Sequence, residues 1–246
     1  MNLTRILAIA ALFATADVAA AQTVDEVVDK HLAALGGRAA VEKIKSRAMT
    51  GTITLVTPGG DVAGTIETWN QAPNKSRTLI KVDLTALGAG PLVIDQRFDG
   101  TTGYVLDSLQ GNRDITGNQL DNMRNAAFPS QLLNYKSRGV AASVTKEKAG
   151  DRDAYVISLE PPAGSVVRHF IDAETYLPLK NVVKVDVPQL GTQVEQTTEF
   201  SDFRVVDGVK SAFRVATSSS VQRFTIDVSK VEHNVAIDES SFSKPR

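Results

Sequence analysis

Histidine is the residue type in this chain best suited to bind a metal or to act as a general base. His31, His169 and His233 are far apart in the sequence, and no two of them have the His-x-His or His-x-x-x-His spacing. A zinc site or a catalytic triad needs side chains that converge on one point. His31 falls on the apolar stripe of an expected helix, where a packed, hydrogen-bonded histidine is the simpler interpretation. The sequence therefore predicts neither a metal site nor a triad.

Serine and glycine also occur without a catalytic or phosphate-binding motif. Ser218, Ser219 and Ser220 are consecutive, but the chain has no Gly-x-Ser-x-Gly elbow and no Ser-x-x-Lys on an expected helix. The glycine-rich segment 88–91 lacks the spacing of nucleotide-binding loops and precedes a strand instead of a helix. We interpret the serines as the end of a strand and a turn, and the glycines as a flexible loop.

Acidic residues are the remaining candidates for acid–base chemistry. Glu195 and Glu199 share one face of an expected strand, with Asp202 close by. Residues four apart on a strand are separated by ~13 Å, which is too far for the carboxylate pair of a glycosidase. A solvated face is the simpler interpretation, so we expect a protein that is not an enzyme.

Apolar residues in unusual places are the candidates for function. Three of them flank the loop at Gly88, two lie on a short helix between two runs of strands, and two follow that helix. The seven candidate ligand-binding residues are Leu84, Leu87, Leu92, Leu120, Met123, Phe128 and Leu132. The loop 188–191 is a further apolar segment. These residues either fill a core or line a cavity for an apolar ligand, in a sheet too wide for two helices to fill.

Two helical segments must position these residues. In residues 23–45, apolar side chains recur at helical spacing, Thr23 and Glu26 have capping-box spacing, and Gly36-Gly37 stops or bends the helix. In residues 116–135, Thr116 and Gln119 repeat that spacing, and Phe128-Pro129 breaks the run.

Strands make up the rest of the pattern, in two meanders over residues 49–109 and 142–231. Turn dipeptides separate them, among them Asp99-Gly100 and Asp207-Gly208. In strand 75–83 one face carries the charged residues and the other only uncharged ones, so we expect the basic face to be solvated. Strands without crossover helices predict a largely antiparallel sheet that must curl, split or close.

The first residues resemble an export signal. Met1 to Arg5 is a short basic start, residues 6–13 are apolar, and Ala19-Ala20-Ala21 offers a signal-peptidase site before Gln22. The apolar run is far shorter than the ~20 residues of a transmembrane helix. The chain has 246 residues, a net charge of −1 and no cysteine, so neither a strongly charged partner nor a disulfide framework is indicated. We expect a signal peptide over 1–21 and one domain over 22–246.

Several patterns resemble the LolA-like family of outer-membrane lipoprotein-sorting and periplasmic lipid-binding proteins, which includes LolA, LolB and LppX. They lie in the opening helix with Leu35-Gly36-Gly37, in strand 170–172 with 177–180, in hairpin 203–208 and in the ending 234–242. The resemblance implies a mainly antiparallel β fold with α-helices: a strongly curved, incomplete β-barrel, or half-barrel, of about 11 strands, with helices covering its open mouth. It also implies an apolar cavity for acyl chains.

Two functional hypotheses remain. The first is a soluble periplasmic carrier of lipid or lipoprotein acyl chains, with residues 116–135 as part of a lid. The alternative is a module that binds another envelope protein through the same curved sheet, without a lipid cargo. In either case we expect a monomer with no cofactor or metal, no nucleic-acid partner and no permanent membrane anchor.

Overall fold

A computed structural model describes residues 22–187 and 191–245. The expected signal peptide, residues 1–21, and residues 188–190 of the apolar loop lie outside the described residues. The elements follow the chain in this order: α1 (Val24–Leu35), α2 (Arg38–Glu42), β1 (Ser46–Thr57), β2 (Gly60–Gln71), β3 (Lys75–Asp83), η1 (Thr85–Leu87), β4 (Pro91–Phe98), β5 (Gly103–Asp107), β6 (Arg113–Ile115), α3 (Gly117–Asn125), η2 (Lys136–Arg138), β7 (Ala141–Ala149), β8 (Arg152–Glu160), β9 (Val167–Asp172), β10 (Pro178–Val187), β11 (Thr192–Val206), β12 (Val209–Ser218), β13 (Arg223–His233) and η4 (Glu239–Phe242).

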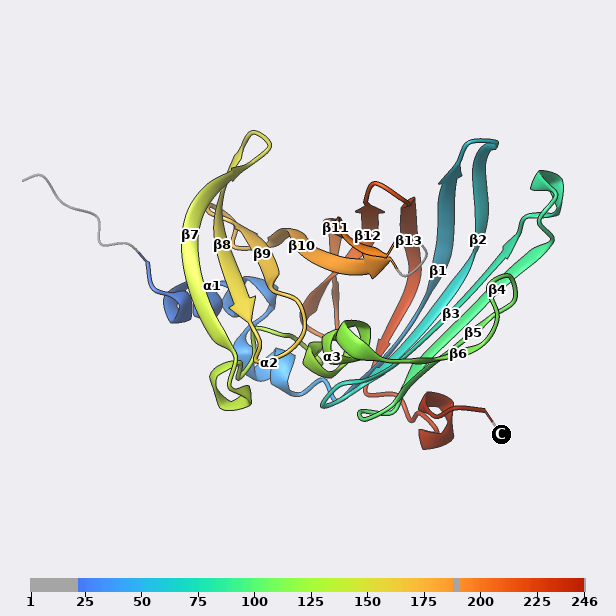
Figure 1. The fold of residues 1–246 in the computed structure, drawn as a ribbon. Helices are drawn as coiled ribbons and strands as arrows, with labels where there is room; N and C mark the ends of the chain where they lie inside the picture. Colours follow the sequence, from blue (N-terminus) through green and yellow to red (C-terminus); the bar gives the residue numbers. More distant parts are fainter. Residues whose placement is uncertain (1–21, 188–190, 246) are drawn as a thin grey trace, which may run out of the picture.

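All strands of the described residues form one antiparallel sheet, which confirms the predicted strand type. Its order is β6-β5-β4-β3-β2-β1-β13-β12-β11-β10-β9-β8-β7. The count of about 11 was wrong, because the sheet has 13 strands. The pattern missed β6, whose three residues are too few to show an alternation. The sheet curves strongly, and its two edges, β6 and β7, are not paired with each other (Figure 1).

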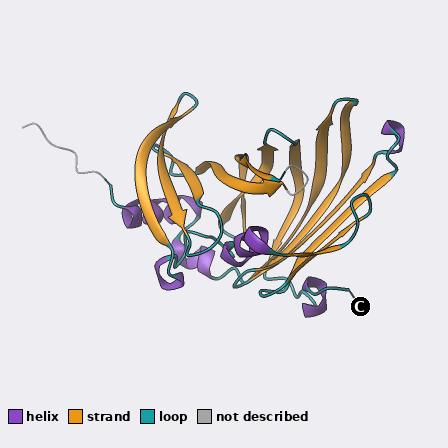
Figure 2. Ribbon diagram, in the orientation of Figure 1, coloured by secondary structure: helices purple, strands orange, loops and turns teal. Residues whose placement is uncertain are grey.

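This strand order determines where α3 lies. β6 and β7 are neighbours in the chain but form opposite edges of the sheet, so their connection must cross the sheet. α3 belongs to this connection and lies between the two arms of the curved sheet (Figures 1 and 2). We call the face of the sheet that α3 contacts the inner face. The predicted helix 116–135 is shorter than expected, since only Gly117–Asn125 is helical and Thr116 makes no side-chain cap hydrogen bond.

The opening helix follows its sequence pattern. Thr23 and Glu26 form the predicted capping box, and Val27, Val28, His31 and Leu32 are the buried face of α1. Val27, Val28 and Leu32 join a core cluster that includes Ile157 of β8 on the inner face. The helix ends at Gly36, where a Cβ atom would lie 2.1 Å from the carbonyl oxygen of Gly208. Only glycine permits this close approach between the helix end and the β11–β12 turn.

The opposite, outer face of β3 and β4 is not the solvated face that we expected. Asp95 is 5% exposed and receives hydrogen bonds from Arg77 and Arg97. The C-terminal turn η4 contacts β3 and β4, and Arg97 also donates to the carbonyl oxygen of Ser243. The basic face therefore anchors the end of the chain.

Candidate functional site

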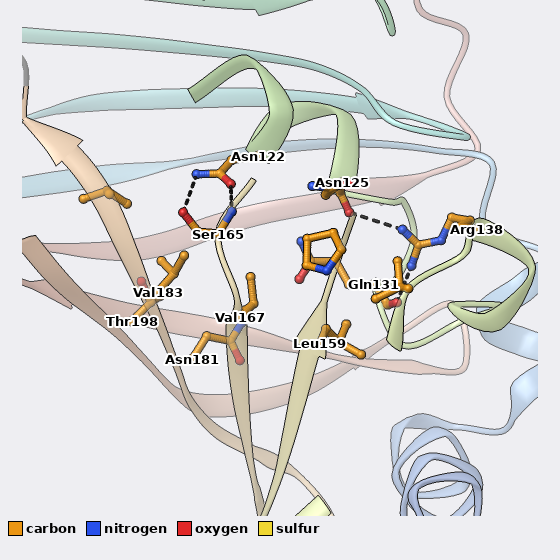
Figure 3. Close-up of a pocket in the computed structure, with 13 residues that line it drawn as sticks. Asn122, Asn125, Gln131, Arg138, Leu159, Ser165, Val167, Asn181, Val183 and Thr198 are labelled. Atoms are coloured by element: carbon orange, nitrogen blue, oxygen red, sulfur yellow. Dashed lines mark hydrogen bonds between the residues drawn. The ribbon is translucent and has the colours of Figure 1, made fainter. Parts of the chain in front are cut away.

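A pocket of about 270 Å³ lies between the inner face of β8–β11 and the connection that carries α3. Its floor consists of strand residues, and its other walls come from α3, from the segment around η2 and from the β8–β9 loop (Figure 3). The lining residues are Asn122, Asn125, Gln131, Arg138, Val140, Leu159, Pro161, Ser165, Val167, Asn181, Val183, Val185 and Thr198.

The floor of the pocket is mainly apolar. Leu159 on β8 pairs with Val167 on β9, which pairs with Val183 on β10. Because paired residues in a sheet point to the same face, these three side chains form one continuous strip. An apolar floor with a few polar groups around it is the usual construction of a small-molecule site.

The α3 side of the pocket is held by hydrogen bonds around Ser165. Asn122 accepts from the backbone N–H of Ser165 at 2.7 Å and donates to its hydroxyl at 3.2 Å (Figure 3). Asn118 donates to the same hydroxyl at 3.0 Å, and Asn125 donates to the carbonyl oxygen of Ala163 at 2.7 Å. Gly164 between them has φ +95°, and a Cβ atom there would lie 2.7 Å from the Asn125 amide nitrogen. α3 is thus attached to the β8–β9 loop through polar contacts.

Arg138 supplies the charge of the pocket. One guanidinium Nη donates to the carbonyl oxygen of Asn125 at 3.3 Å and the other to that of Gln131 at 2.5 Å (Figure 3). The Nε atom is buried and has no hydrogen-bond partner among the described residues. Burial lowers the pKa of Arg138.

Two histidines lie beside the floor: His169 on β9 pairs with Asn181 of the lining, and His31 of α1 is close to His169. The Nδ1 atom of His31 lies 2.9 Å from the carbonyl oxygen of Tyr176. Because a carbonyl oxygen only accepts, Nδ1 carries the proton and donates it. Burial, with a smaller contribution from nearby His31, lowers the pKa of His169 to about 4, while a hydrogen bond with Asn181 opposes the shift. Burial also lowers the pKa of His31. Both imidazoles are therefore neutral at pH 7.

The three predicted site residues that flank the loop at Gly88 lie in the other arm of the sheet. Leu84 and Leu92 pack against the cluster of Ile53, Ile66 and Val82 on the inner face. Leu87 is 41% exposed in η1. None of the three lines the pocket.

The other four predicted residues lie nearer to the pocket. Leu120 and Met123 of α3 pack against Phe98 and Ile115, so the apolar side of this helix faces the sheet and its asparagines face the pocket. The remaining pair, Phe128 and Leu132, belong to the core cluster beneath α1. The structure does not gather the seven residues into one site, and ligand binding by them stays a prediction.

Sequence reasoning missed the asparagines and Arg138. Asn118, Asn122 and Asn125 occur at i, i+4 and i+7, which places them on one helix face. This polar stripe, opposite to the apolar one of Leu120 and Met123, was the available signal. Arg138 had no signal, because it lies in a turn and meets the strands only in the folded chain.

A second pocket of about 360 Å³ adjoins the first and shares Ser165 and Val183 with it. Arg168, Lys184 and Glu195 supply its charges. Among the described residues, no group of three or more histidine, cysteine, aspartate or glutamate side chains could hold a metal ion. Within 22–187 and 191–245, helices are too short or too polar to cross a membrane.

Comparison with known proteins identifies the fold. No family model and no curated protein matches the chain. Among solved structures, a LolA superfamily protein from Nitrosomonas europaea is similar with a TM-score of 0.56 and 15% identity, over 91% of this chain and 99% of the other. A DUF1329 family protein from Desulfovibrio piger has a TM-score of 0.56 and 14% identity, over 89% and 97%. A domain assigned to outer membrane lipoprotein sorting in Vibrio parahaemolyticus has a TM-score of 0.55 and 12% identity, over 89% of this chain and 97% of the other. The chain therefore has the LolA-like fold, as its sequence patterns predicted.

Proposed function

We propose that this protein is an exported, non-catalytic binding protein of the periplasm that carries a lipid or lipoprotein acyl chain. Residues 22–246 act as a single monomeric domain. The acyl chain lies on the apolar floor of the pocket, and α3 with the segment after it acts as the lid.

The pocket carries this proposal. Its floor offers Leu159, Val167 and Val183 to a ligand. On the pocket side α3 is attached by asparagine hydrogen bonds, whereas its apolar packing is on its other side. Hydrogen bonds of this kind contribute about 1 kcal/mol each, so a lid held by a few of them can open and close. A carrier needs such a lid, because it must both accept and release its cargo.

The expected affinity is moderate. Each buried methylene contributes ~0.8 kcal/mol, so about fourteen of them, as in a long acyl chain, contribute ~11 kcal/mol. Association costs at least about 4 kcal/mol. The net free energy that remains after this cost corresponds to reversible binding, which suits a carrier better than a storage protein.

The similarity to a LolA superfamily protein and to a lipoprotein-sorting domain supports the same proposal and the periplasmic location. Fold similarity alone does not establish a ligand. The proposal therefore depends on what the pocket holds.

Mass spectrometry of organic extracts tests it. Natively purified protein should release an acyl-chain compound in near-stoichiometric amount, and protein with Val183→Trp, which fills the floor, should release little. If extracts of the native protein contain no such compound while cross-linking in the periplasm captures a defined protein partner, the alternative of an envelope interaction module replaces the carrier.

A further inference from the structure

Arg138 differs from the other cations around it. Lys136, two residues earlier in the same turn, forms an ion pair with Asp25 of α1. Arg77 and Arg97 on the outer face share the carboxylate of Asp95. Arg138 has no acidic partner within ion-pair distance among the described residues, and it is the one charged residue that lines the first pocket.

The guanidinium is also incompletely hydrogen-bonded. A guanidinium has five N–H groups, and Arg138 uses one on the carbonyl oxygen of Asn125 and one on that of Gln131. Its buried Nε has no partner in the described part of the chain. A cation in such surroundings is destabilised by burial without the compensation of a negative charge. An anion that enters the pocket would supply that compensation.

The other polar groups of the pocket leave this role to Arg138. Asn122 and Asn125 are engaged with the β8–β9 loop. Thr198 shares a hydrogen bond with Thr217 at 3.3 Å. The lining contains no aspartate or glutamate that would repel an anion.

We propose that Arg138 binds the acidic head group of a single-chain amphiphile whose chain lies on the floor of Leu159, Val167 and Val183. The head group is an oxyanion, either a carboxylate or a phosphate monoester, because these match the planar N–H pattern of arginine. The chain is single because about 270 Å³ lies just below the usual ~300–1,000 Å³ of ligand pockets and leaves no room for two chains.

This inference rests on the proposed function and specifies its ligand. Isothermal titration of the delipidated protein with decanoate, decyl phosphate and decanol tests the head-group inference separately from the proposed function. The three probes share the same chain and differ in charge. Inorganic phosphate is a fourth probe, which detects an anion site that needs no chain.

We expect decanoate and decyl phosphate to bind at least about tenfold more tightly than decanol, which is the effect of one charge-assisted contact. Inorganic phosphate alone should bind far more weakly than decyl phosphate. Added salt should reduce the preference for the acids.

Variants of Arg138 decide whether this residue is responsible. In Arg138→Gln the preference for acid over alcohol should fall to near unity, and Arg138→Lys should keep most of it. Arg223→Gln, an exposed arginine with no ion pair in the described chain, is the matched control and should change nothing. The ratio within each variant is the readout, because a merely structural role of Arg138 would weaken acid and alcohol alike.

Any of four results would overturn the inference. Equal binding of decanol and decanoate to the native protein, or an unchanged ratio in folded Arg138→Gln, removes the head-group site and leaves the carrier intact. If Arg138→Gln weakens the binding of acid and alcohol equally, Arg138 only supports the structure of the lid and does not contact the head group. Absence of binding by all three chain ligands contradicts the proposed function itself.

Discussion

At the scale of residues, the outer face of the sheet depends on one buried carboxylate. Asp95 accepts four hydrogen bonds, two from Arg77 at 2.8 Å each and two from Arg97 at 3.2 and 2.7 Å. Burial raises the pKa of the Asp95 carboxyl, but the hydrogen bonds from the two arginines outweigh it, so this pKa lies below its ordinary value. The carboxylate is thus charged in the folded protein.

Asp95→Asn should lower the free energy of unfolding by about 3 kcal/mol, because it leaves two partly buried arginines without their shared counter-charge. Urea unfolding at pH 7 measures the change. Asp227→Asn, which breaks an exposed pair with Arg214, is the matched control and should cost at most about 1 kcal/mol. Equal losses in the two variants would show that the Asp95 cluster has no special role.

His169 is the basis of a second prediction at the scale of residues, which concerns how stability depends on pH. Its folded pKa of about 4 lies below the ordinary value of 6.5, so the unfolded chain binds the extra proton first as pH falls. The stability that depends on neutral His169 is therefore complete above pH 6.5 and is lost as pH falls toward 4, by up to about 3 kcal/mol. His31, also buried, adds to this loss.

His169→Leu should reduce the decrease of unfolding free energy between pH 7 and pH 4.5, because leucine has no proton to bind. Urea unfolding at a series of pH values measures the slope. A slope equal to that of the native protein would mean that His169 is protonated in the folded state or that other groups dominate.

At the scale of elements, α3 is attached on two sides by different kinds of interaction. Leu120 and Met123 pack on Phe98 and Ile115, whereas Asn122 and Asn125 are bonded to the β8–β9 loop. The apolar side is the stronger attachment, since buried side chains contribute more than exchangeable hydrogen bonds. We therefore expect the lid to open at the asparagine side.

Asn122→Ala removes both hydrogen bonds to Ser165 and should accelerate release of a bound acyl probe about tenfold, with little change in melting temperature. Stopped-flow displacement measures the release rate. Asn118→Ala removes one hydrogen bond and should have a smaller effect. Equal release rates in all three proteins would place the opening elsewhere.

Local signals in the sequence predicted elements well and their meeting points poorly. Two local features were recognisable: the capping box of Thr23 and Glu26, and the turn at Asp207-Gly208, where both residues have positive φ. The interactions that form each of them join residues close together in the chain. The Asp95 cluster depends on the register of β3 against β4, which places Leu79 opposite Asp95 and Arg77 opposite Arg97. Arg138 meets β8–β11 only because β6 and β7 are opposite edges of the sheet. Neither long-range pairing can be predicted from spacing.

At the scale of the whole molecule, the pairing of β1 with β13 places the first and the last strand side by side in the middle of the sheet. The connection from β6 to β7 must then cross the inner face. A sheet of this width therefore acquires a crossing segment and a pocket beneath it from its topology, without an added domain.

The location of the protein is a further whole-molecule prediction. Residues 1–21 should be removed on export, because Ala19 and Ala21 occupy the two specificity positions of a signal-peptidase site. Intact-mass measurement of protein from the periplasmic fraction should give a chain that begins at Gln22. A full-length mass in that fraction would contradict cleavage after Ala21.

The central claim is that an acyl chain lies on the floor of the first pocket. Titration of the delipidated protein with a fluorescent long-chain fatty acid tests it most directly, comparing Val183→Trp on the floor with Val205→Trp, whose native side chain is 65% exposed on β11. We predict saturable binding with Kd on the order of micromolar in the native protein and in Val205→Trp, and at least about tenfold weaker binding in folded Val183→Trp. Native-like binding by Val183→Trp, or no binding by the native protein, would contradict the account.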